Sequence, residues 1–207
     1  MAKKQKIAGV NIFLYREYYS NQTTQEIQKE LRKEVKWEKV KIKLFGKEYL
    51  SPRLSAWYGE KSYKYSGHKW KKNIFPKSII KIKEDVEKLT SLKFNGVLVN
   101  LYRNGQDSMG WHSDNEKELG HDPKIVSVVF GEKRRFLIRQ KKLKKNKKEI
   151  KFENGDIMLM SSGVQKNWEH SIPKTAKTVG ERINLTFRLI YWLVRNHKKG
   201  LIFFLIL

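Results

Sequence analysis

Hydrophobic residues recur at two different periods along the chain. Two segments have the three- and four-residue spacing of an amphipathic helix. The first contains Ile27, Leu31 and Val35, and the second contains Ile79, Ile82, Val86 and Leu89 after Pro76. Thr23-Thr24-Gln25-Glu26 has the form of a capping box, so we predict that the first helix begins there and packs on the outside of a sheet.

Most of the remaining chain has the pattern of short strands. Runs of apolar or alternating residues are separated by Gly, Asn and Asp, which favour turns. The expected strands are residues 12–15, 97–102, 125–130, 135–139, 150–152, 157–160 and 183–190. Many short strands separated by turn residues predict a mainly β (α+β) fold with a jelly-roll core, flanked by the two N-terminal helices.

Length, and the lack of an internal repeat or a convincing linker, indicate one domain. A chain of 207 residues suffices for one well-buried core. We expect a basic tail at residues 1–10, a single domain at 11–192 and an apolar tail at 193–207. The seven apolar residues Leu201–Leu207 are far fewer than the about twenty that a membrane helix needs, so we expect no membrane span. Three roles stay open for them: covering an apolar patch, lying on a membrane surface, or being a non-native end.

The charge balance changes the picture of the surface. The formal net charge is +24, with 45 Lys and Arg against 21 Asp and Glu. Such an excess indicates a polyanionic partner such as nucleic acid, although it says nothing about which base is recognised. The alternative is a simple accumulation of solvated lysines. The lysine run Lys141–Lys148, in an expected hairpin loop, has the same two interpretations.

The chain contains no cysteine, which excludes a disulfide framework, a zinc ribbon and a thiol nucleophile. Met1–Lys6 lacks the apolar region of a secretory signal. We interpret this short basic run as a solvated tail, with a role in nuclear import as the alternative. We therefore expect an intracellular protein, nuclear in a eukaryotic host and otherwise cytoplasmic. We also expect a monomer.

One short motif indicates metal chemistry. His112-Ser113-Asp114 supplies an imidazole and a carboxylate at a two-residue spacing, and His170 is a candidate third ligand. Two histidines and one carboxylate on one face of a metal are typical of non-haem Fe(II) oxygenases, because the opposite positions stay open. The alternative for His112 is an ordinary core or surface histidine.

The segment Glu181–Arg188, which begins eleven residues after His170, adds a second signal. Its polar residues alternate with apolar ones, which predicts a half-buried strand with one polar face. That face contains Arg182, Asn184, Thr186 and Arg188. Arginines beside a metal favour a carboxylate ligand, since the guanidinium fork binds carboxylates bidentately. 2-Oxoglutarate has two carboxylates and also chelates iron. Taken alone, the segment also suits a solvent-facing edge strand with ordinary surface arginines.

Taken in order, these motifs resemble the AlkB-type 2-oxoglutarate- and Fe(II)-dependent dioxygenases that repair alkylated nucleic acids, particularly the AlkB homologue two type, which favours double-stranded DNA. The resemblance extends from about Ile12 to Tyr191. The matching segments are Pro52-Arg53, Tyr58-Gly59, Tyr63-Lys64-Tyr65-Ser66-Gly67, Asn100-Leu101-Tyr102, His112-Ser113-Asp114, His170 and Arg182–Arg188. Each match alone is weak, whereas the ordered set is specific. The resemblance implies that the jelly roll is a double-stranded β-helix.

The resemblance also implies cofactors and their ligands. Fe(II), 2-oxoglutarate and O2 are expected, with succinate, CO2 and formaldehyde as products of the oxidative demethylation of a base. The expected metal ligands are His112, Asp114 and His170. The expected 2-oxoglutarate contacts are Asn100 and Arg188 at the 1-carboxylate, Tyr102 and Arg182 at the 5-carboxylate, and Asn184 and Thr186 beside them.

Substrate recognition is expected in the region of residues 40–75 and directly after the metal motif. Tyr63 and Tyr65 would lie on one face of a strand as a platform for a flipped base, with Ser66 beside them; ordinary core packing of these tyrosines is the alternative. Asn115 and Glu116 are expected near the exocyclic group of the base. Members of this type often have an acid where this chain has Asn115, so the resemblance leaves base preference open.

Leu44-Phe45-Gly46-Lys47 resembles the hydrophobic finger of double-strand-specific members. The finger fills the gap that a flipped base leaves and partly offsets the loss of stacking. We therefore expect Phe45, Gly46 and Lys47 to contact DNA; a buried Phe next to a turn glycine is the alternative.

Three functions remain. The preferred one is repair of 1-methyladenine and 3-methylcytosine in DNA, preferably duplex DNA. The second is the same chemistry on single-stranded DNA or RNA. The third, a catalytically silent nucleic-acid-binding module, is disfavoured because the metal and arginine motifs are all present.

Overall fold

The computed structural model describes residues 3–44, 47–65, 67–196 and 200–204, without the side chains of 43–44, 64–65, 192–196 and 200–204. Its helices are α1 (Asn21–Glu34), α2 (Lys77–Thr90), η1 (Lys117–Leu119) and α3 (Val164–Asn167). Its strands are β1 (Lys3–Lys6), β2 (Ile12–Arg16), β3 (Lys41–Leu44), β4 (Lys47–Leu50), β5 (Leu54–Gly59), β6 (Tyr63–Tyr65), β7 (His68–Trp70), β8 (Gly96–Tyr102), β9 (Met109–His112), β10 (Ile125–Gly131), β11 (Phe136–Gln140), β12 (Lys147–Ile150), β13 (Ile157–Met160), β14 (Trp168–Ile172), β15 (Arg182–Arg188), β16 (Trp192–Asn196) and β17 (Gly200–Phe204).

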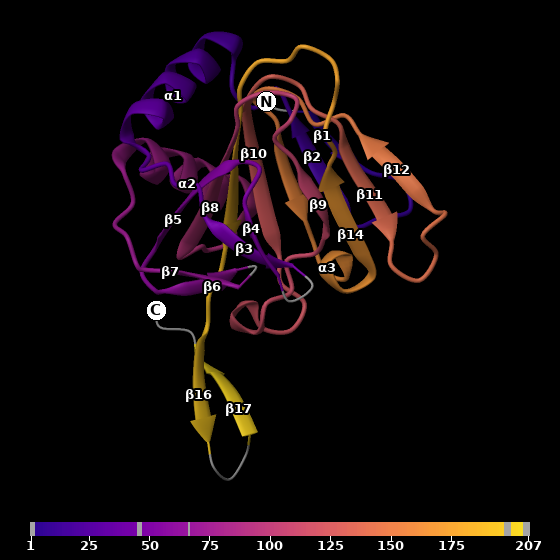
Figure 1. Ribbon diagram of the computed structural model, residues 1–207. Helices are drawn as coiled ribbons and strands as arrows, with labels where there is room; N and C mark the ends of the chain where they lie inside the picture. The colour runs from indigo at the N-terminus through magenta and orange to yellow at the C-terminus, as the bar shows by residue number, and fades with distance from the viewer. Residues whose placement is uncertain (1–2, 45–46, 66, 197–199, 205–207) are drawn as a thin grey trace.

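Two antiparallel sheets form the core (Figure 1). The major sheet has the strand order β1-β2-β13-β10-β15-β8-β5, and the minor sheet has the order β12-β11-β14-β9. Side chains from both sheets meet in one buried cluster, for example Val129 and Met160 from the major sheet with Ile138 and Ile172 from the minor sheet. This packing of two sheets confirms the predicted mainly β fold with a jelly-roll core.

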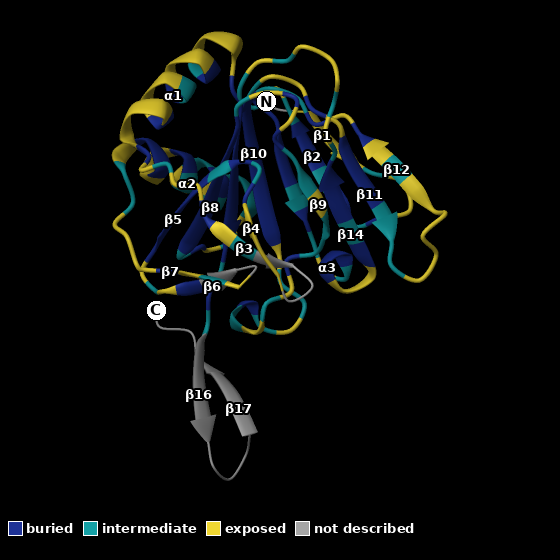
Figure 2. Ribbon diagram, viewed as in Figure 1, coloured by how far each residue is buried: buried dark blue, intermediate teal, exposed yellow. Residues whose placement is uncertain are grey.

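The two long helices cover the outer face of the major sheet. Ile27 and Leu31 of α1 and Ile79 of α2 lie in a second buried cluster with Val128 and Leu185 of the sheet. Figure 2 shows the consequence: the central strands are buried throughout, while the outer face of α1 is exposed. The predicted flanking helices are therefore confirmed, and they cover the face of the major sheet that points away from the minor sheet.

Helix α1 begins earlier than the capping-box pattern predicted. Its N-cap is Ser20, whose side-chain oxygen accepts a hydrogen bond from the Thr23 backbone N–H. Thr23 therefore lies within the first turn, and the predicted start at Thr23 is wrong. Ser20 caps the N–H of Thr23, whereas Thr23 as N-cap would have capped the N–H of Glu26, so the helix gains about one turn at its start.

Three further expectations differ from the structure. β12 spans Lys147–Ile150, so the strand expected at residues 150–152 begins inside the lysine run instead. Residues 3–6, expected in a solvated tail, form the exposed edge strand β1, which pairs with β2. β15 is buried on both faces between β10 and β8, so neither a half-buried strand nor an exposed edge strand describes it.

Smaller hairpins lie outside the two sheets. β3 pairs with β4, β6 with β7, and β16 with β17. Phe45, Gly46 and Ser66 of the expected substrate region lie outside the described residues, as do the side chain of Tyr65 and residues 205–207 of the apolar tail. Within the described part of the chain, no helix combines the length and the apolar character that crossing a bilayer requires. The domain boundaries stay a prediction.

Candidate metal centre and adjoining cavity

The structure brings the three expected metal ligands together. His112 is the last residue of β9, and it pairs with His170 of the neighbouring strand β14. Asp114 lies two residues beyond the end of β9. One ligand atom from each of the three residues lies within 4.8 Å of the others. Side chains that are more than fifty residues apart in sequence thus converge because β9 and β14 are adjacent strands.

Burial favours the neutral form of both imidazoles, which is the form that binds a metal. The Nδ1 atom of His112 lies 2.9 Å from the carbonyl oxygen of Gly110, so Nδ1–H donates and Nε2 keeps its lone pair for a metal. Burial lowers the pKa of His112. Burial, together with the neighbouring His112, lowers the pKa of His170 to about 3. The ring of His170 stacks on Phe136, with centroids 5.4 Å apart, which fixes its plane.

The carboxylate of Asp114 is buried, with 1% of the residue exposed, and is ionised. Burial opposes its ionisation, but the charge of Arg188 and its hydrogen bond outweigh burial and lower the pKa of Asp114 to about 2. Arg188 Nη2 donates to Asp114 Oδ1 at 2.7 Å, and Oδ2 lies 3.9 Å from His170 Nε2. Two neutral imidazoles and one carboxylate form a donor set that fits Fe(II).

A cavity adjoins these three residues on the inner side of both sheets. Its free interior volume is about 30 Å³. Its polar lining consists of Arg53, Asn100, Tyr102, His112, Asp114, Ser127, His170, Asn184, Thr186 and Arg188. The expected contacts Asn100, Tyr102, Asn184 and Thr186 therefore border the cavity, and their contact with 2-oxoglutarate stays a prediction.

Asn100 is held in one orientation. Its Oδ1 accepts hydrogen bonds from Arg53 Nε at 2.9 Å and from Ser55 Oγ at 2.8 Å. The amide NH2 group of Asn100 is consequently the side available to a ligand in the cavity. The resemblance assigned Arg53 to nucleotide recognition. In this structure Arg53 is 4% exposed, and its side chain orients Asn100 through a hydrogen bond.

Arg182 is a buried cation with unused donors. It is fully buried, and its Nη2 lies 3.4 Å from Asn184 Oδ1. Among the described residues, its Nε and Nη1 atoms find no hydrogen-bond partner. Burial lowers the pKa of Arg182 to about 10, which still leaves it protonated at neutral pH. A buried guanidinium with free N–H groups fits a carboxylate ligand, because an unpaired buried charge is otherwise strongly unfavourable.

The arginines at the two ends of β15 have different partners. Arg182 lies opposite Tyr102 of β8, and its guanidinium is 5.5 Å from the Tyr102 ring. Arg188 lies at the other end and is engaged with the candidate ligand Asp114. Its expected contact with the 1-carboxylate of 2-oxoglutarate therefore stays a prediction.

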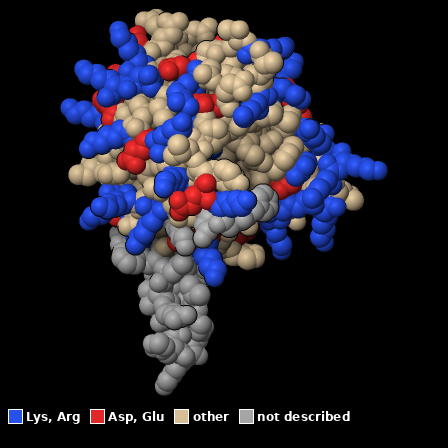
Figure 3. Space-filling view, viewed as in Figure 1, with Lys and Arg blue, Asp and Glu red and all other residues tan. Residues whose placement is uncertain are grey.

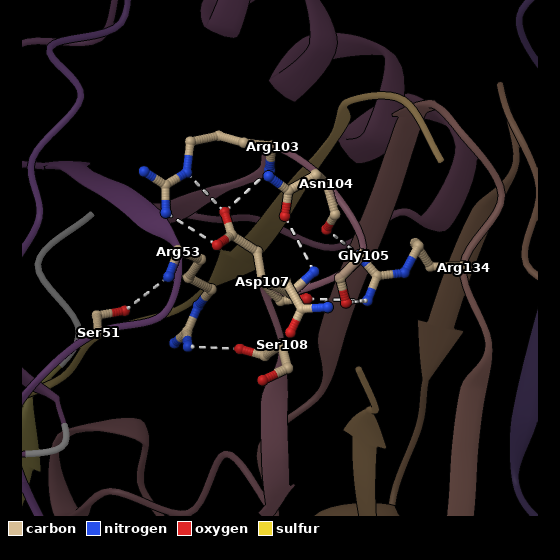
Figure 4. A network of polar contacts seen from close by, with 9 residues as sticks. Ser51, Arg53, Arg103, Asn104, Gly105, Asp107, Ser108 and Arg134 are labelled. Atoms are coloured by element: carbon tan, nitrogen blue, oxygen red, sulfur yellow. Dashed lines mark hydrogen bonds and ion pairs between the residues drawn. The ribbon is translucent and has the colours of Figure 1, made fainter. Parts of the chain in front are cut away.

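A polar network fixes the loop between β8 and β9, which leads to the metal motif (Figure 4). Arg103 makes a bidentate contact with Asp107, through Nε at 2.8 Å and Nη2 at 2.9 Å. Arg134 donates to the backbone carbonyls of Asn104 and Asp107, each at 2.8 Å. The Ser108 carbonyl at the end of this loop accepts from Arg53 Nη1 at 3.3 Å, so the loop also supports Asn100.

The expected substrate residues are brought together only in part. Tyr63 is 1% exposed and stacks on Trp57, with centroids 4.5 Å apart. Tyr63 is therefore packed in the core, which was the alternative interpretation, and does not form an open platform for a flipped base. Glu116 is half-buried near Tyr63; burial and the charge of Asp114 raise the pKa of Glu116 to about 7. Asn115 and Lys47 are exposed.

Three residues that support the site were not predicted from the sequence: Ser55, Ser127 and Gln165. Ser55 and Ser127 donate to Asn100 and Asn184, and Gln165 accepts the backbone N–H of Asp114. Nothing in their local sequence indicates these contacts, since each joins segments at least 45 residues apart.

Comparison with known proteins identifies the family. The family model described as "2OG-Fe(II) oxygenase superfamily" matches residues 11–188. The chain belongs to this superfamily. Its members are named for Fe(II) and 2-oxoglutarate, the metal and cosubstrate that the donor set and the buried Arg182 fit.

Relatives in this superfamily include two named AlkB types. The chain is 38% identical to alpha-ketoglutarate-dependent dioxygenase alkB homolog 3 from Bos taurus over 152 residues, which is 69% of this chain and 53% of that protein. It is 33% identical to DNA oxidative demethylase ALKBH2 from Arabidopsis thaliana over 189 residues, or 77% of this chain and 60% of that protein. The chain spans about half the length of the alkB homolog 3 relatives. The solved structure of OsALKBH1 has the same fold, with a TM-score of 0.67 over 90% of this chain and 100% of that chain, at 17% identity.

Proposed function

We propose that this oxygenase removes alkyl groups oxidatively from the bases of nucleic acid, and that its substrates are 1-methyladenine and 3-methylcytosine in DNA, preferably duplex. The observation that supports this most is the convergence of His112, Asp114 and His170 at a cavity whose lining residue Asn184 contacts the buried guanidinium of Arg182. The curated relatives named DNA oxidative demethylase direct the choice of substrate class.

In this proposal the chain's own residues perform binding and orientation. The two imidazoles and the Asp114 carboxylate hold Fe(II), and the free N–H groups of Arg182 bind the distal carboxylate of 2-oxoglutarate. The oriented amide of Asn100 contacts its other end. When bound, the iron and cosubstrate supply the oxidation of a methyl group on a base nitrogen, with O2 consumed and succinate and CO2 formed. The hydroxylated methyl group then leaves as formaldehyde.

The charge of the chain supports a polyanionic substrate. On the face in Figure 3, Lys and Arg far outnumber Asp and Glu, and they gather over the β11–β12 hairpin at the right edge. With a net charge of +24, attraction to phosphates is strong and independent of sequence. A base within a helix must be flipped out to reach a buried centre, so the phosphate contacts hold the strand while the base enters.

The duplex preference rests on one sequence feature. Leu44–Lys47 resembles a hydrophobic finger, and strands β3 and β4 pair on either side of residues 45–46. An apolar side chain that replaces a flipped base favours duplex over single-stranded substrates. We propose a monomer that acts inside the cell, in the nucleus if the host is eukaryotic.

Formaldehyde release tests the proposal. Oligonucleotides with 3-methylcytosine are offered in duplex and single-stranded form, with Fe(II), 2-oxoglutarate and ascorbate, to the wild type, Asp114→Ala and Phe45→Ala. The proposal expects release from the duplex that is lost in Asp114→Ala and selectively reduced in Phe45→Ala. Release mainly from single strands or RNA, unaffected by Phe45→Ala, would overturn the duplex preference. Nucleic-acid binding without 2-oxoglutarate consumption would indicate a silent binding module.

A further inference from the structure

The candidate ligand Asp114 lies outside regular secondary structure. Strand β9 ends at His112, and η1 begins only at Lys117. The backbone N–H of Asp114 therefore has no partner from a sheet or a helix. It is nonetheless buried, and it donates to the side-chain Oε1 of Gln165 at 2.9 Å.

Gln165 is itself held firmly. It is 1% exposed and belongs to α3, the short helix that leads directly into β14 and His170. Its Nε2 lies 3.5 Å from the sulfur of Met160, which defines the orientation of the amide. Its backbone carbonyl accepts a hydrogen bond from Lys141 Nζ at 2.8 Å.

One hydrogen bond thus connects the segment of Asp114 to the segment of His170. We propose that Gln165 is a positioning residue for the metal site: it places the Asp114 main chain so that the carboxylate is aligned with the two imidazoles before a metal binds. The inference rests on the proposed metal role of Asp114. It assigns Gln165 to metal affinity rather than to the chemistry of the bound substrate.

The physical reason is the burial of the N–H group. Without an acceptor at position 165, a buried donor is left unsatisfied, and residues 113–116 shift toward a conformation that solvates it. Since Asp114 lies within this segment, its carboxylate moves relative to His112 and His170. Residues that orient metal ligands through hydrogen bonds change metal affinity by about tenfold to a hundredfold when they are replaced.

Binding of Co(II) to the metal-free full chain tests the inference. The visible absorption of bound Co(II) gives both the dissociation constant and the coordination geometry. Gln165→Met keeps the size of the side chain but removes the acceptor, and we expect about tenfold weaker Co(II) binding with an altered spectrum. Gln165→Glu keeps an acceptor oxygen and is expected to recover part of the affinity. Gln22→Met, the same change on the exposed face of α1, is the matched control.

Asp114→Ala separates the inference from the proposed function. If Asp114→Ala binds Co(II) as tightly as the wild type, the proposed metal site itself is wrong. If Asp114→Ala loses binding but Gln165→Met retains the wild-type dissociation constant and spectrum, the site stands and the positioning role is overturned. A lower melting temperature of metal-free Gln165→Met with unchanged Co(II) binding would also overturn the positioning role, because it would show that Gln165 only stabilises the fold.

A second pair of variants tests the positioning role of Gln165 if Gln165→Met does not fold. Lys141→Met removes the hydrogen bond to the Gln165 carbonyl, whereas Lys142→Met removes a neighbouring exposed charge. We expect weaker Co(II) binding in Lys141→Met than in Lys142→Met, which should match the wild type. Equal affinity in the two lysine variants would overturn the inference.

Discussion

At the scale of single residues, two buried arginines show how structure separates a folding role from a binding role. Arg134 is 4% exposed, and its guanidinium donates to several backbone carbonyls, including those of Asn104, Asp107 and Pro173. Arg182 is fully buried, yet two of its nitrogens find no partner among the described residues. A satisfied cation stabilises the fold, whereas an unsatisfied one indicates that a ligand completes it.

This difference predicts opposite effects of the same substitution. Arg134→Met leaves buried carbonyls without donors, so it should lower the melting temperature of the ligand-free protein by several degrees, on the order of 2 kcal/mol. Arg182→Met removes an unpaired buried charge, so it should leave that melting temperature unchanged or raise it. In the presence of Mn(II), 2-oxoglutarate should raise the melting temperature of the wild type but not of Arg182→Met. Thermal unfolding by circular dichroism checks all three; a 2-oxoglutarate shift that persists in Arg182→Met contradicts the assignment.

At the scale of elements, periodicity predicts the strands and helices whose burial follows their sequence. The strand at residues 157–160 is β13, and the pattern of Ile79, Ile82 and Val86 falls within α2. The start of α1 could not be fixed in this way, because Ser20 and Thr23 both suit an N-cap and only the tertiary path selects Ser20. β12 could not be predicted inside a lysine run, since its pairing with β11 is decided by the partner strand.

The site, like the secondary structure, could be predicted in part. His112, Asp114 and the arginines of β15 have a characteristic spacing, so the sequence indicates them. Gln165 and Ser55 contribute single hydrogen bonds across distant segments, and such contacts follow only from the folded arrangement. The full burial of Tyr63 belongs to the same class, because its partner Trp57 lies on a different strand.

The loop between β8 and β9 gives a prediction about pH. Burial opposes the ionisation of Asp107, but its hydrogen bonds with Arg103 outweigh burial and lower the pKa of Asp107. A carboxylate whose folded pKa lies below its unfolded value of about 4 stabilises the fold above that pH, and this stability is lost as the pH falls through the folded pKa.

Asp107→Asn should therefore be less stable than the wild type near about pH 7, and the gap should close as the pH falls below about 4. Melting temperatures across this range measure the gap. Glu149→Gln, which removes the carboxylate of an exposed ion pair with Arg135, is the control and should show almost no gap. A gap for Asp107→Asn that stays constant down to acid pH would contradict the ion-pair explanation.

At the scale of the whole molecule, we expect the net charge to govern affinity for nucleic acid and the cavity to govern selection of the base. The net charge of +24 favours attraction to a polyanion, whereas the three predicted metal ligands line a cavity between the two sheets. Affinity for nucleic acid and selection of a methylated base are therefore expected to respond differently to salt.

Raising the salt concentration should weaken binding of an oligonucleotide steeply, because each phosphate contact releases a counterion; the expected log–log slope is about −0.9 per contact with duplex DNA. Methylated and unmethylated duplexes should show the same slope and differ only in offset. Fluorescence anisotropy at several salt concentrations measures both quantities. A flat salt dependence would mean that the lysines are merely solvated and that the charge does not guide nucleic acid to the site.

The central claim is that this chain removes a methyl group from a base through the centre formed by His112, Asp114 and His170. The most direct measurement is the mass of a 3-methylcytosine duplex oligonucleotide after incubation with the protein, Fe(II), 2-oxoglutarate and O2. We expect the product to have the mass of the unmethylated oligonucleotide, only when 2-oxoglutarate is present, and not with Asp114→Ala. An unchanged mass with the wild type, under conditions in which the protein binds Fe(II) and 2-oxoglutarate, would contradict the proposed substrate; an equal conversion by Asp114→Ala would contradict the proposed centre.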